Sequence, residues 1–392
     1  MRWRRRGASE HSSAGPSAGR SAGPLISVVV PVFDVADYLP AALDSLLAQT
    51  HPHLDVVVVD DGSTDSSGTV ADSYAARDPR VLVVHTDNHG LGAARNTGLA
   101  HARGDLVAFL DSDDVLPPGA YSTMLASLTR SGSDFVTGSI VRWESAGSAD
   151  ERWVEPPWMR RLHRPARSRA VAAEHPEILG DVFAWNKLFR RSFWDQAGLT
   201  WPEGVRYEDQ PTTTRAFLAG RFDVLPEVVY HWRIRADGSS ITQQRSSVTD
   251  LADRLATKRM ALASVTAYGD EATSRVFLDR VLAGDLHRYF AEVPGCSDEW
   301  WALLRQGIGD LWGAHSLVHS GLPPVHRLAG WLVEQDRRAD AAALMRYAAA
   351  LGGPLPRVVD DGPPRLDVSG VPGLTDPAGL PPAALALRPH ET

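Results

Sequence analysis

Short runs of apolar residues alternate with amphipathic stretches through the first third of the chain. Four runs are almost entirely apolar, at residues 26–30, 56–59, 81–84 and 106–110. Strands without polar alternation are typical of a parallel sheet that helices cover on both faces. After the first run, leucines recur with the spacing of one helix face, at Leu39, Leu43, Leu46 and Leu47. The pattern therefore predicts an open α/β sheet.

The regular pattern stops between residues 141 and 177, which are rich in Arg, Pro and Trp and have no clear period. We expect long loops there, lying over the ligand site. Strand and helix signals return at residues 182–189, 208–218 and 224–230. The sheet domain should therefore cover residues 24–245.

A helical pattern follows this domain. Apolar residues recur every four positions along residues 278–290, and residues 339–350 are rich in Ala. We expect a small helical domain at residues 248–351. Gly and Pro crowd the remainder, which predicts a largely extended and mobile tail at residues 352–392.

The start of the chain is basic, with four arginines in the first six residues, and continues in Ser, Ala and Gly. Composition predicts a disordered basic tail at residues 1–23, and an arm that touches an anionic membrane surface stays open as the second interpretation. No apolar run approaches the ~20 residues of a membrane span. The chain's one cysteine, Cys296, excludes an intrachain disulfide. A cytoplasmic protein, with peripheral contact at the inner face of the membrane left open, is the simplest expectation.

Overall charge narrows the class of partner. The 392 residues carry a formal net charge of −8, and no basic stripe repeats along the chain. This balance argues against duplex nucleic acid as a partner. The helical domain has three open roles: it binds polymer, pairs subunits into an oligomer or docks at a membrane.

Acidic residues stand directly after two of the apolar runs. Asp60 and Asp61 follow the second run, where they can bind a ribose diol or a base N–H, or cap the next helix. Asp111 and Asp113 follow the fourth run, where two carboxylates can approach one point. Hard divalent cations such as Mn²⁺ and Mg²⁺ prefer this oxygen set and bridge to phosphates. Ligands bind beyond the carboxyl ends of strands in such sheets, so these acids are candidates.

A glycine-rich helix start follows the third run, with the sequence GLGAARN at residues 90–96. It partly matches the dinucleotide-binding fingerprint, which would indicate a different class of enzyme. Arg95 replaces the third glycine, the preceding loop is long and the strand is the third, so we reject that class. Arg95 can supply a cation to a diphosphate at the helix start, and an exposed ion pair is the equal alternative.

Two later groups carry candidate chemistry. Glu208 and Asp209 open a predicted helix, whose dipole stabilises an acidic side chain as the anion, as a general base requires. Helix starts prefer acids for structural reasons too. Trp185, Asn186 and Lys187 combine an aromatic face with polar groups that hold sugar rings, although the same residues could form core.

Four sequence blocks resemble the family 2 glycosyltransferases, which have the GT-A fold. They are SVVVPVF at 27–33, VDDGSTD at 59–65, NHGLGAARN at 88–96 and FLDSDD at 109–114. Order and spacing both match, and the similarity covers roughly residues 24–244. The later segments around Asn186, Glu208 and Tyr230 look most like enzymes that modify bacterial cell-surface polymers, among them the wall teichoic acid glycosyltransferases.

The resemblance implies an open mixed GT-A sheet and an inverting, metal-dependent transfer from a UDP-sugar to a hydroxyl of a glycan or polyol-phosphate polymer. It implies Asp209 as the base with Glu208 beside it, Asp113 and His231 as metal ligands, and an acceptor site at Trp185, Asn186 and Lys187. The donor site it implies comprises Pro31, Phe33, Asp60, Asp61, Arg95, Asn96, Asp111, Arg233 and Ser240.

Two other classes of protein share parts of this pattern. A sugar nucleotidyltransferase shares the sheet and the metal chemistry, but it needs a glycine-rich loop after its first strand, where this chain has PVFDVA at residues 31–36. A carbohydrate-binding or nucleotide-sugar-binding protein without catalysis explains the tryptophans but not the paired acids at strand ends. Metal-dependent hydrolysis of a UDP-sugar would separate an enzyme from a binding protein.

Overall fold

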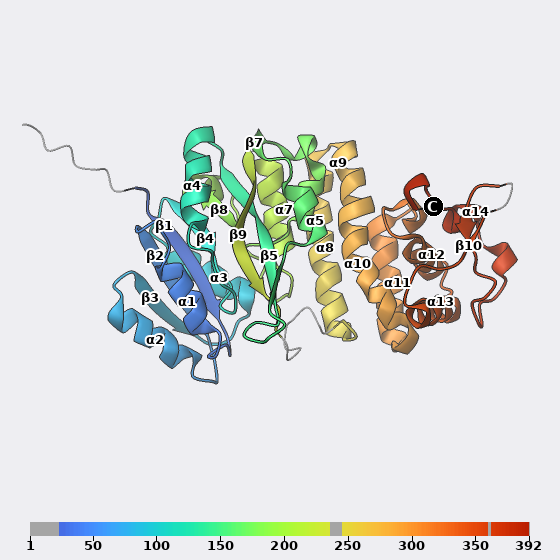
Figure 1. Cartoon of the computed structure of the whole chain (residues 1–392), viewed down its shortest axis with the longest axis horizontal. Coiled ribbons are helices and arrows are strands. Elements are labelled where there is room, and N and C mark those ends of the chain that lie inside the picture. The colour runs from blue at the N-terminus through green and yellow to red at the C-terminus, as the bar shows by residue number, and fades with distance from the viewer. Residues whose placement is uncertain (1–22, 236–244, 360–361, 392) are drawn as a thin grey trace, which may run out of the picture.

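A nine-stranded sheet forms the centre of the computed structural model, which describes residues 23–235, 245–359 and 362–391 (Figure 1). The strand order is β3–β2–β1–β4–β8–β5–β9–β7, with β6 paired to β5. The strands are β1 (Ile26–Val32), β2 (Leu54–Asp61), β3 (Val81–Thr86), β4 (Leu106–Phe109), β5 (Phe135–Glu144), β6 (Arg152–Val154), β7 (Arg167–Ala170), β8 (Lys187–Arg190) and β9 (Phe222–Arg233).

Strand directions make the sheet mixed. Strands β1 to β4 are mutually parallel where they pair, whereas β8 runs antiparallel between β4 and β5. Strand β5 then pairs in parallel with β9, and β7 closes the edge antiparallel to β9. Every residue of β1 and β2 is buried, as expected for strands covered on both faces. The expected open mixed sheet is confirmed.

Helices cover both faces of the sheet. Side chains of α1, α2, α4 and α5 pack on the face to which Val28 and Val30 point, and those of α3, α6 and α7 pack on the face of Val29. This division follows from the alternation of side chains along a strand. These helices are α1 (Leu39–Leu47), α2 (Ser67–Arg77), α3 (Leu91–His101), α4 (Ala120–Ser131), α5 (Pro157–His163), α6 (Arg191–Gln196) and α7 (Asp209–Ala219).

The order of strands places a binding crevice beside β1. The chain proceeds from β1 to β2 and β3 on one side, then returns to add β4 on the other. Ligands of open α/β sheets bind at this switch point, beyond the carboxyl ends of the strands. The ends of β1, β2 and β4 lead into Phe33, Asp61 and Asp111 respectively, so three predicted site residues start from one edge.

Residues 141–177 differ from the expected long loops. They complete β5, turn back as β6, form α5 and add β7 to the edge of the sheet. These elements are short and their outward faces polar, which is why no period was visible in the sequence. Their expected position over the site is found, since Trp158, Arg161 and His175 line the cavity described below.

The helical segment extends from the sheet to one end of the molecule (Figure 1). Its side chains do not form a separate core, because Leu251 and Leu255 belong to the same hydrophobic cluster as Phe217 of α7. The segment comprises α8 (Val248–Tyr268), α9 (Glu271–Val276), a π-helix (Phe277–Leu282), α10 (Ala283–Leu286), a 3₁₀ stretch (His287–Gly295), α11 (Asp298–Trp312), α12 (Pro324–Glu334) and α13 (Arg338–Leu351).

The segment after α13 differs from the expected extended and mobile tail. It contains a small hairpin of β10 (Arg357–Val358) and β11 (Arg365–Leu366) and a short helix α14 (Pro382–Leu385). Arg327 of α12 pairs with Glu391 near its end. The reason is an apolar side chain every few residues between the prolines; those buried are Leu355, Leu366, Val368, Val371, Leu374, Leu380, Ala384 and Leu387.

One prediction of the domain organisation concerns residues that the structure does not describe. Residues 1–22, which hold nearly all of the proposed basic tail, lie outside the described residues. Among the helices that are described, none is both long and apolar enough to cross a membrane.

Candidate active site

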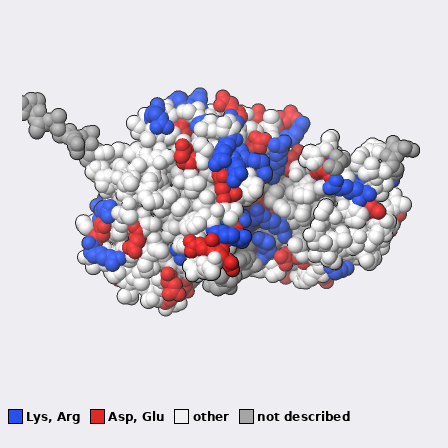
Figure 2. All heavy atoms as spheres, in the orientation of Figure 1, with Lys and Arg blue, Asp and Glu red and all other residues white. Residues whose placement is uncertain are grey.

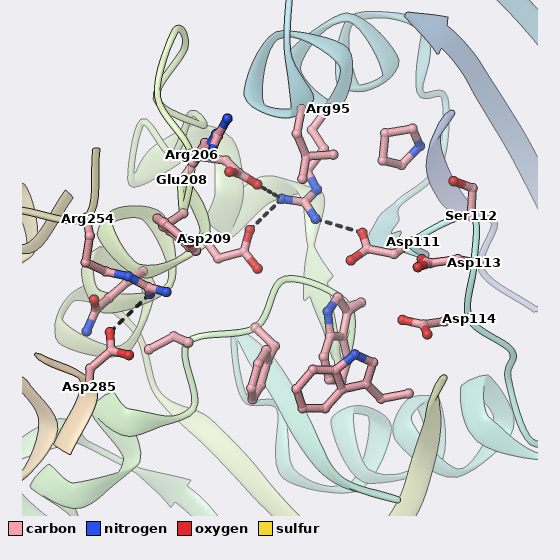
Figure 3. A pocket seen from close by; sticks show the side chains of 18 of the residues that line it. Arg95, Asp111, Ser112, Asp113, Asp114, Arg206, Glu208, Asp209, Arg254 and Asp285 are labelled. Carbon is pink, nitrogen blue, oxygen red and sulfur yellow. Dashed lines mark hydrogen bonds and ion pairs between the residues drawn. The ribbon is translucent and has the colours of Figure 1, made fainter. Parts of the chain in front are cut away.

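A large cavity opens at the carboxyl edge of the sheet (Figure 3). Its volume is about 1930 Å³, against roughly 300–1,000 Å³ for an ordinary small-molecule site. Its walls come from the ends of β1, β2 and β4, from the start of α7, and from the helical segment at α8 and α10. The cavity therefore has room for two substrates.

Arg95 joins the groups that line the middle of this cavity. Its side chain is fully buried on α3, and its guanidinium donates to the carboxylates of Glu208 and Asp209, and to Asp111 at 2.8 Å (Figure 3). Burial alone would lower the pKa of Arg95, but the three carboxylates outweigh it and raise that pKa. Residues more than a hundred positions apart are thus held around one permanent cation.

Glu208 and Asp209 differ in their surroundings. Glu208 is almost fully buried at the end of the loop before α7, whereas Asp209 is partly open to the cavity. Burial, followed by the adjacent Asp209 carboxylate, raises the pKa of Glu208 well above its usual value in spite of Arg95. Asp209 is therefore the member of the pair that a substrate can reach.

The acidic loop after β4 lines the same cavity. Burial is the largest cause that raises the pKa of Asp111, to about 6. Asp113 forms an ion pair of 2.7 Å with Arg235. Asp114 is buried and accepts hydrogen bonds from the Tyr230 hydroxyl at 2.8 Å and the Arg233 amide at 2.7 Å. Asp114 thus anchors the loop, while Asp111 and Asp113 present oxygens to the cavity.

These two carboxylates suit a hard divalent cation, which takes oxygen ligands and leaves positions for phosphates and water. No cluster of three or more metal-ligating side chains exists in the described part of the chain. His231 does not line the cavity: its ring packs against Trp153, with centroids 4.6 Å apart. Trp232, the next residue of β9, lines the cavity, whereas Arg233 does not and lies over the rings of Tyr38 and Trp143.

Asp60 and Asp61 are separated by the same alternation. The Asp61 carboxylate lines the cavity and accepts from the amides of His89 at 3.0 Å and Gly90 at 2.8 Å. The Asp60 carboxylate does not line the cavity and binds the His85 ring at 2.9 Å and the Ser63 amide at 3.2 Å. Of this pair, the structure brings Asp61 to the site.

The remaining predicted residues divide between the cavity and its frame. Pro31, Phe33 and Trp185 line it, with 46% of Phe33 exposed. Asn96 instead fixes a neighbouring loop by donating to the Trp201 carbonyl at 2.9 Å. Ser240 lies outside the described residues.

Asn186 and Lys187 are fully buried behind the cavity. The Lys187 ammonium donates to the carbonyls of Asp181 at 2.9 Å and Phe183 at 2.7 Å, and Asn186 donates to the Asp181 carboxylate. The expectation that they contact an acceptor is therefore wrong. Their polar groups are consumed in holding the turn that presents Trp185, whose ring stacks on Tyr230 with centroids 4.0 Å apart.

Several lining residues were not predicted from the sequence. Arg235 pairs with Asp113, and Arg254 and Lys258 of α8 both pair with Asp285 of α10. Figure 3 shows Arg254 beside Asp285. The spacing of Arg254 and Lys258 by four residues puts them on one helix face and is the signal that could have found them. Nothing in the sequence indicates that this face meets the sheet edge.

Comparisons with known proteins agree with this geometry. Residues 27–196 match the family model described as Glycosyl transferase family 2. Two Bacillus subtilis proteins, the uncharacterized glycosyltransferase EpsJ and the putative glycosyltransferase EpsH, are 34% identical over 215 residues and 33% identical over 225 residues. The matches span 54% and 56% of this chain and 61% and 63% of those relatives, less than two thirds of their length.

A solved structure supports the fold over more of the chain. S. aureus TarS 1–349 in complex with UDP-GlcNAc superposes with a TM-score of 0.67 at 21% identity, covering 89% of this chain and 99% of TarS 1–349. At this identity the likeness concerns the fold. It includes most of the helical segment, which the family model does not reach.

Proposed function

We propose, from the premise that residues 27–196 form a family 2 glycosyltransferase domain, that this chain transfers a sugar from a UDP-sugar to a hydroxyl of a cell-surface glycan or polyol-phosphate polymer. The observation that carries the proposal is the Arg95 network, in which one buried cation joins Asp111 of the strand-end loop to the Glu208–Asp209 pair. The transferase domain at residues 24–245 and a helical domain at 248–351 belong to the same proposal.

The donor nucleotide would occupy the part of the cavity beside β1 and β2. Asp61 presents a carboxylate to accept from the base or ribose, and the exposed Phe33 ring offers an apolar face to the base. The structural neighbour TarS was solved with UDP-GlcNAc, which supports a UDP-sugar. Asp60 acts at a distance in this scheme, by holding the loop of Ser63 and the ring of His85.

Asp111 and Asp113 would hold Mn²⁺ or Mg²⁺ together with the donor diphosphate. When bound there, such an ion neutralises the charge that develops on the departing diphosphate. Arg95 and Arg235 pair with these two carboxylates, at 2.8 and 2.7 Å. This proposal assigns no role to His231 and Arg233, because neither residue lines the cavity.

Asp209 would serve as the base of a single inverting displacement. The acceptor hydroxyl loses its proton to Asp209 as its oxygen attacks the anomeric carbon, and the bond from that carbon to the diphosphate oxygen breaks to release UDP. Glu208 is buried and its carboxylate accepts from Arg95, so it is not placed to compete for the acceptor's proton. Arg95 fixes the carboxylate of Asp209 in the cavity.

Release of UDP from a panel of UDP-sugars with Mn²⁺ tests this proposal. A family 2 glycosyltransferase is expected to transfer the sugar slowly to water and so release UDP. Adding EDTA should stop this release. If the chain binds UDP but releases no UDP from any of the UDP-sugars, with or without metal, the result would indicate a nucleotide-sugar-binding protein and overturn the proposal.

A further inference from the structure

The cavity continues past Asp209 into a second half with the opposite charge. Its lining there includes eight basic side chains against three acidic ones, Glu177, Asp253 and Asp285. Figure 2 shows Lys and Arg side chains gathered in the middle of this face, between the sheet and the helical end of the molecule. We call the eight residues the basic wall: Arg161, Arg164, Arg167, Arg206, Arg254, Lys258, Arg280 and Arg288.

The basic wall is assembled from three separate parts of the chain. Arg161 lies on α5 and Arg164 and Arg167 follow it, Arg206 precedes α7, and the remaining four lie on the helical segment. Cations from several elements thus line one hollow, instead of spreading over a convex surface. In a chain whose net charge is −8, this concentration is local.

Acidic partners neutralise only a part of this charge. Asp285 pairs with both Arg254, at 3.2 Å, and Lys258, and Arg280 pairs with Glu177 at 2.8 Å. Arg164 pairs with Glu155 at 3.3 Å, and Arg206 pairs with Asp250 at 3.6 Å. Arg161 and Arg288 are exposed, and neither has an ion-pair or hydrogen-bond partner among the residues that the structure describes. The buried Nε of Arg167 likewise has no partner there. An anion that entered the cavity could therefore accept charge-assisted hydrogen bonds from these arginines.

The position of the basic wall indicates which kind of anion it binds. The donor diphosphate belongs at Asp111 and Asp113, on the other side of Asp209. A bilayer surface is flat and cannot enter a hollow lined from several sides. A flexible chain that carries phosphates can lie along the wall with a hydroxyl at Asp209, and the volume of about 1930 Å³ leaves room for it beside the nucleotide.

We propose that the basic wall binds phosphate groups of a phosphodiester polymer on either side of the hydroxyl that receives the sugar. This rests on the proposed function and narrows it, because the alternative of a neutral glycan acceptor is dropped. The helical segment would thereby bind the acceptor's phosphates and form part of the active site; its residues in the basic wall are Arg254, Lys258, Arg280 and Arg288.

Binding of a fluorescently labelled glycerol-phosphate hexamer to the full chain, followed by anisotropy at low salt, tests the proposal. The Arg161→Gln/Arg288→Gln double variant should bind the hexamer about tenfold or more weakly, since two charge-assisted contacts are lost. The matched control is Arg130→Gln/Arg346→Gln, which removes two exposed arginines outside the cavity and should bind as wild type does.

Three outcomes would overturn the proposal: equal binding by the two double variants, equally strong binding of neutral maltohexaose, or a loss that appears with phosphatidylglycerol vesicles but not with the hexamer. Stabilisation by UDP, measured as a shift in melting temperature, verifies that the variants are folded. Absence of UDP release by the wild type together with charge-dependent hexamer binding would refute the transferase proposal and keep the basic wall.

Discussion

The two halves of the cavity are built in different ways. The acidic half consists of Asp61, at the end of β2, and of Asp111 and Asp113, in the loop after β4, so its geometry is set by the register of the sheet. The basic half consists of helix faces and connecting turns that meet only in the folded chain. We propose metal and donor binding for the first half and recognition of a flexible charged chain for the second. A sequence motif therefore identifies the acidic half of the cavity, whereas the basic half can be recognised only in the folded structure.

Replacing Asp209, which lies between the two halves of the cavity, should have the largest effect on turnover. We expect Asp209→Asn to lower kcat by at least ~10³-fold, near the upper part of the usual contribution of a general base. UDP affinity and hexamer affinity should both stay near wild type, because the amide keeps the shape of the side chain. Steady-state kinetics with the two binding assays measure this, and Asp195→Asn on α6 is the control. Near-normal turnover would remove Asp209 from the mechanism.

Removing the Arg95 cation should damage stability as well as activity. Arg95→Ala leaves Glu208, Asp209 and Asp111 close together without compensation, and loss of one partner from a buried ionic network costs about 3–5 kcal/mol. Arg95→Lys should recover part of this free energy of unfolding, because it restores a charge without the two-pronged geometry. Urea unfolding measures both. Equal stability of the alanine variant and the wild type would show that the network does not hold the halves together.

Metal removal should separate the two halves directly. Adding EDTA should abolish UDP release and weaken UDP binding, while leaving hexamer binding to the basic wall unchanged. Asp113→Asn should lower turnover about 10–100-fold, with partial recovery at higher Mn²⁺, as expected for weakened metal coordination. Titration with Mn²⁺ measures this. Hexamer binding that also requires Mn²⁺ would contradict the division of roles.

The smallest expected effect distinguishes the two neighbouring acids of β2. Asp61→Asn should weaken UDP binding about tenfold, through loss of one charged hydrogen-bond acceptor. Asp60→Asn should weaken it less than about threefold, because its carboxylate faces His85 and Ser63. Isothermal calorimetry with UDP and Mn²⁺ measures both. A larger loss for Asp60→Asn would mean that the ligand reaches the outer side of β2.

The sequence allowed the sheet and the acidic half to be predicted, because four apolar runs end in recognisable polar blocks. It could not determine on which side of a strand each residue faces relative to the ligand. Alternation separates Asp61 from Asp60, and Trp232 from His231, by a single position. The polarity of Asn186 and Lys187 was misleading for a related reason: their hydrogen bonds are made inside the protein with Asp181.

The basic wall was beyond prediction because its members come from three segments whose contact depends on the packing of α8 against α7. Sequence patterns establish the face of a helix but not the neighbour that this face meets. The prediction of an extended C-terminal segment differs from the structure for another reason. Its Gly and Pro content favours irregular backbone, but irregular backbone can still bury Leu366, Val368 and Leu380.

One consequence follows from the hydrophobic cluster shared by α7 and α8. Rotating the helical segment away would expose Phe217, Leu251 and Leu255, each worth about 1.5–3 kcal/mol of buried apolar surface. The distance between Asp209, the proposed base, and the arginines of the helical segment is therefore set when the chain folds; these are Arg254 of α8 and, on either side of α10, Arg280 and Arg288. Under the proposed function, a polymer whose repeat length matches this distance would contact Asp209 and these arginines at once, which would favour it over polymers of similar chemistry and different repeat length.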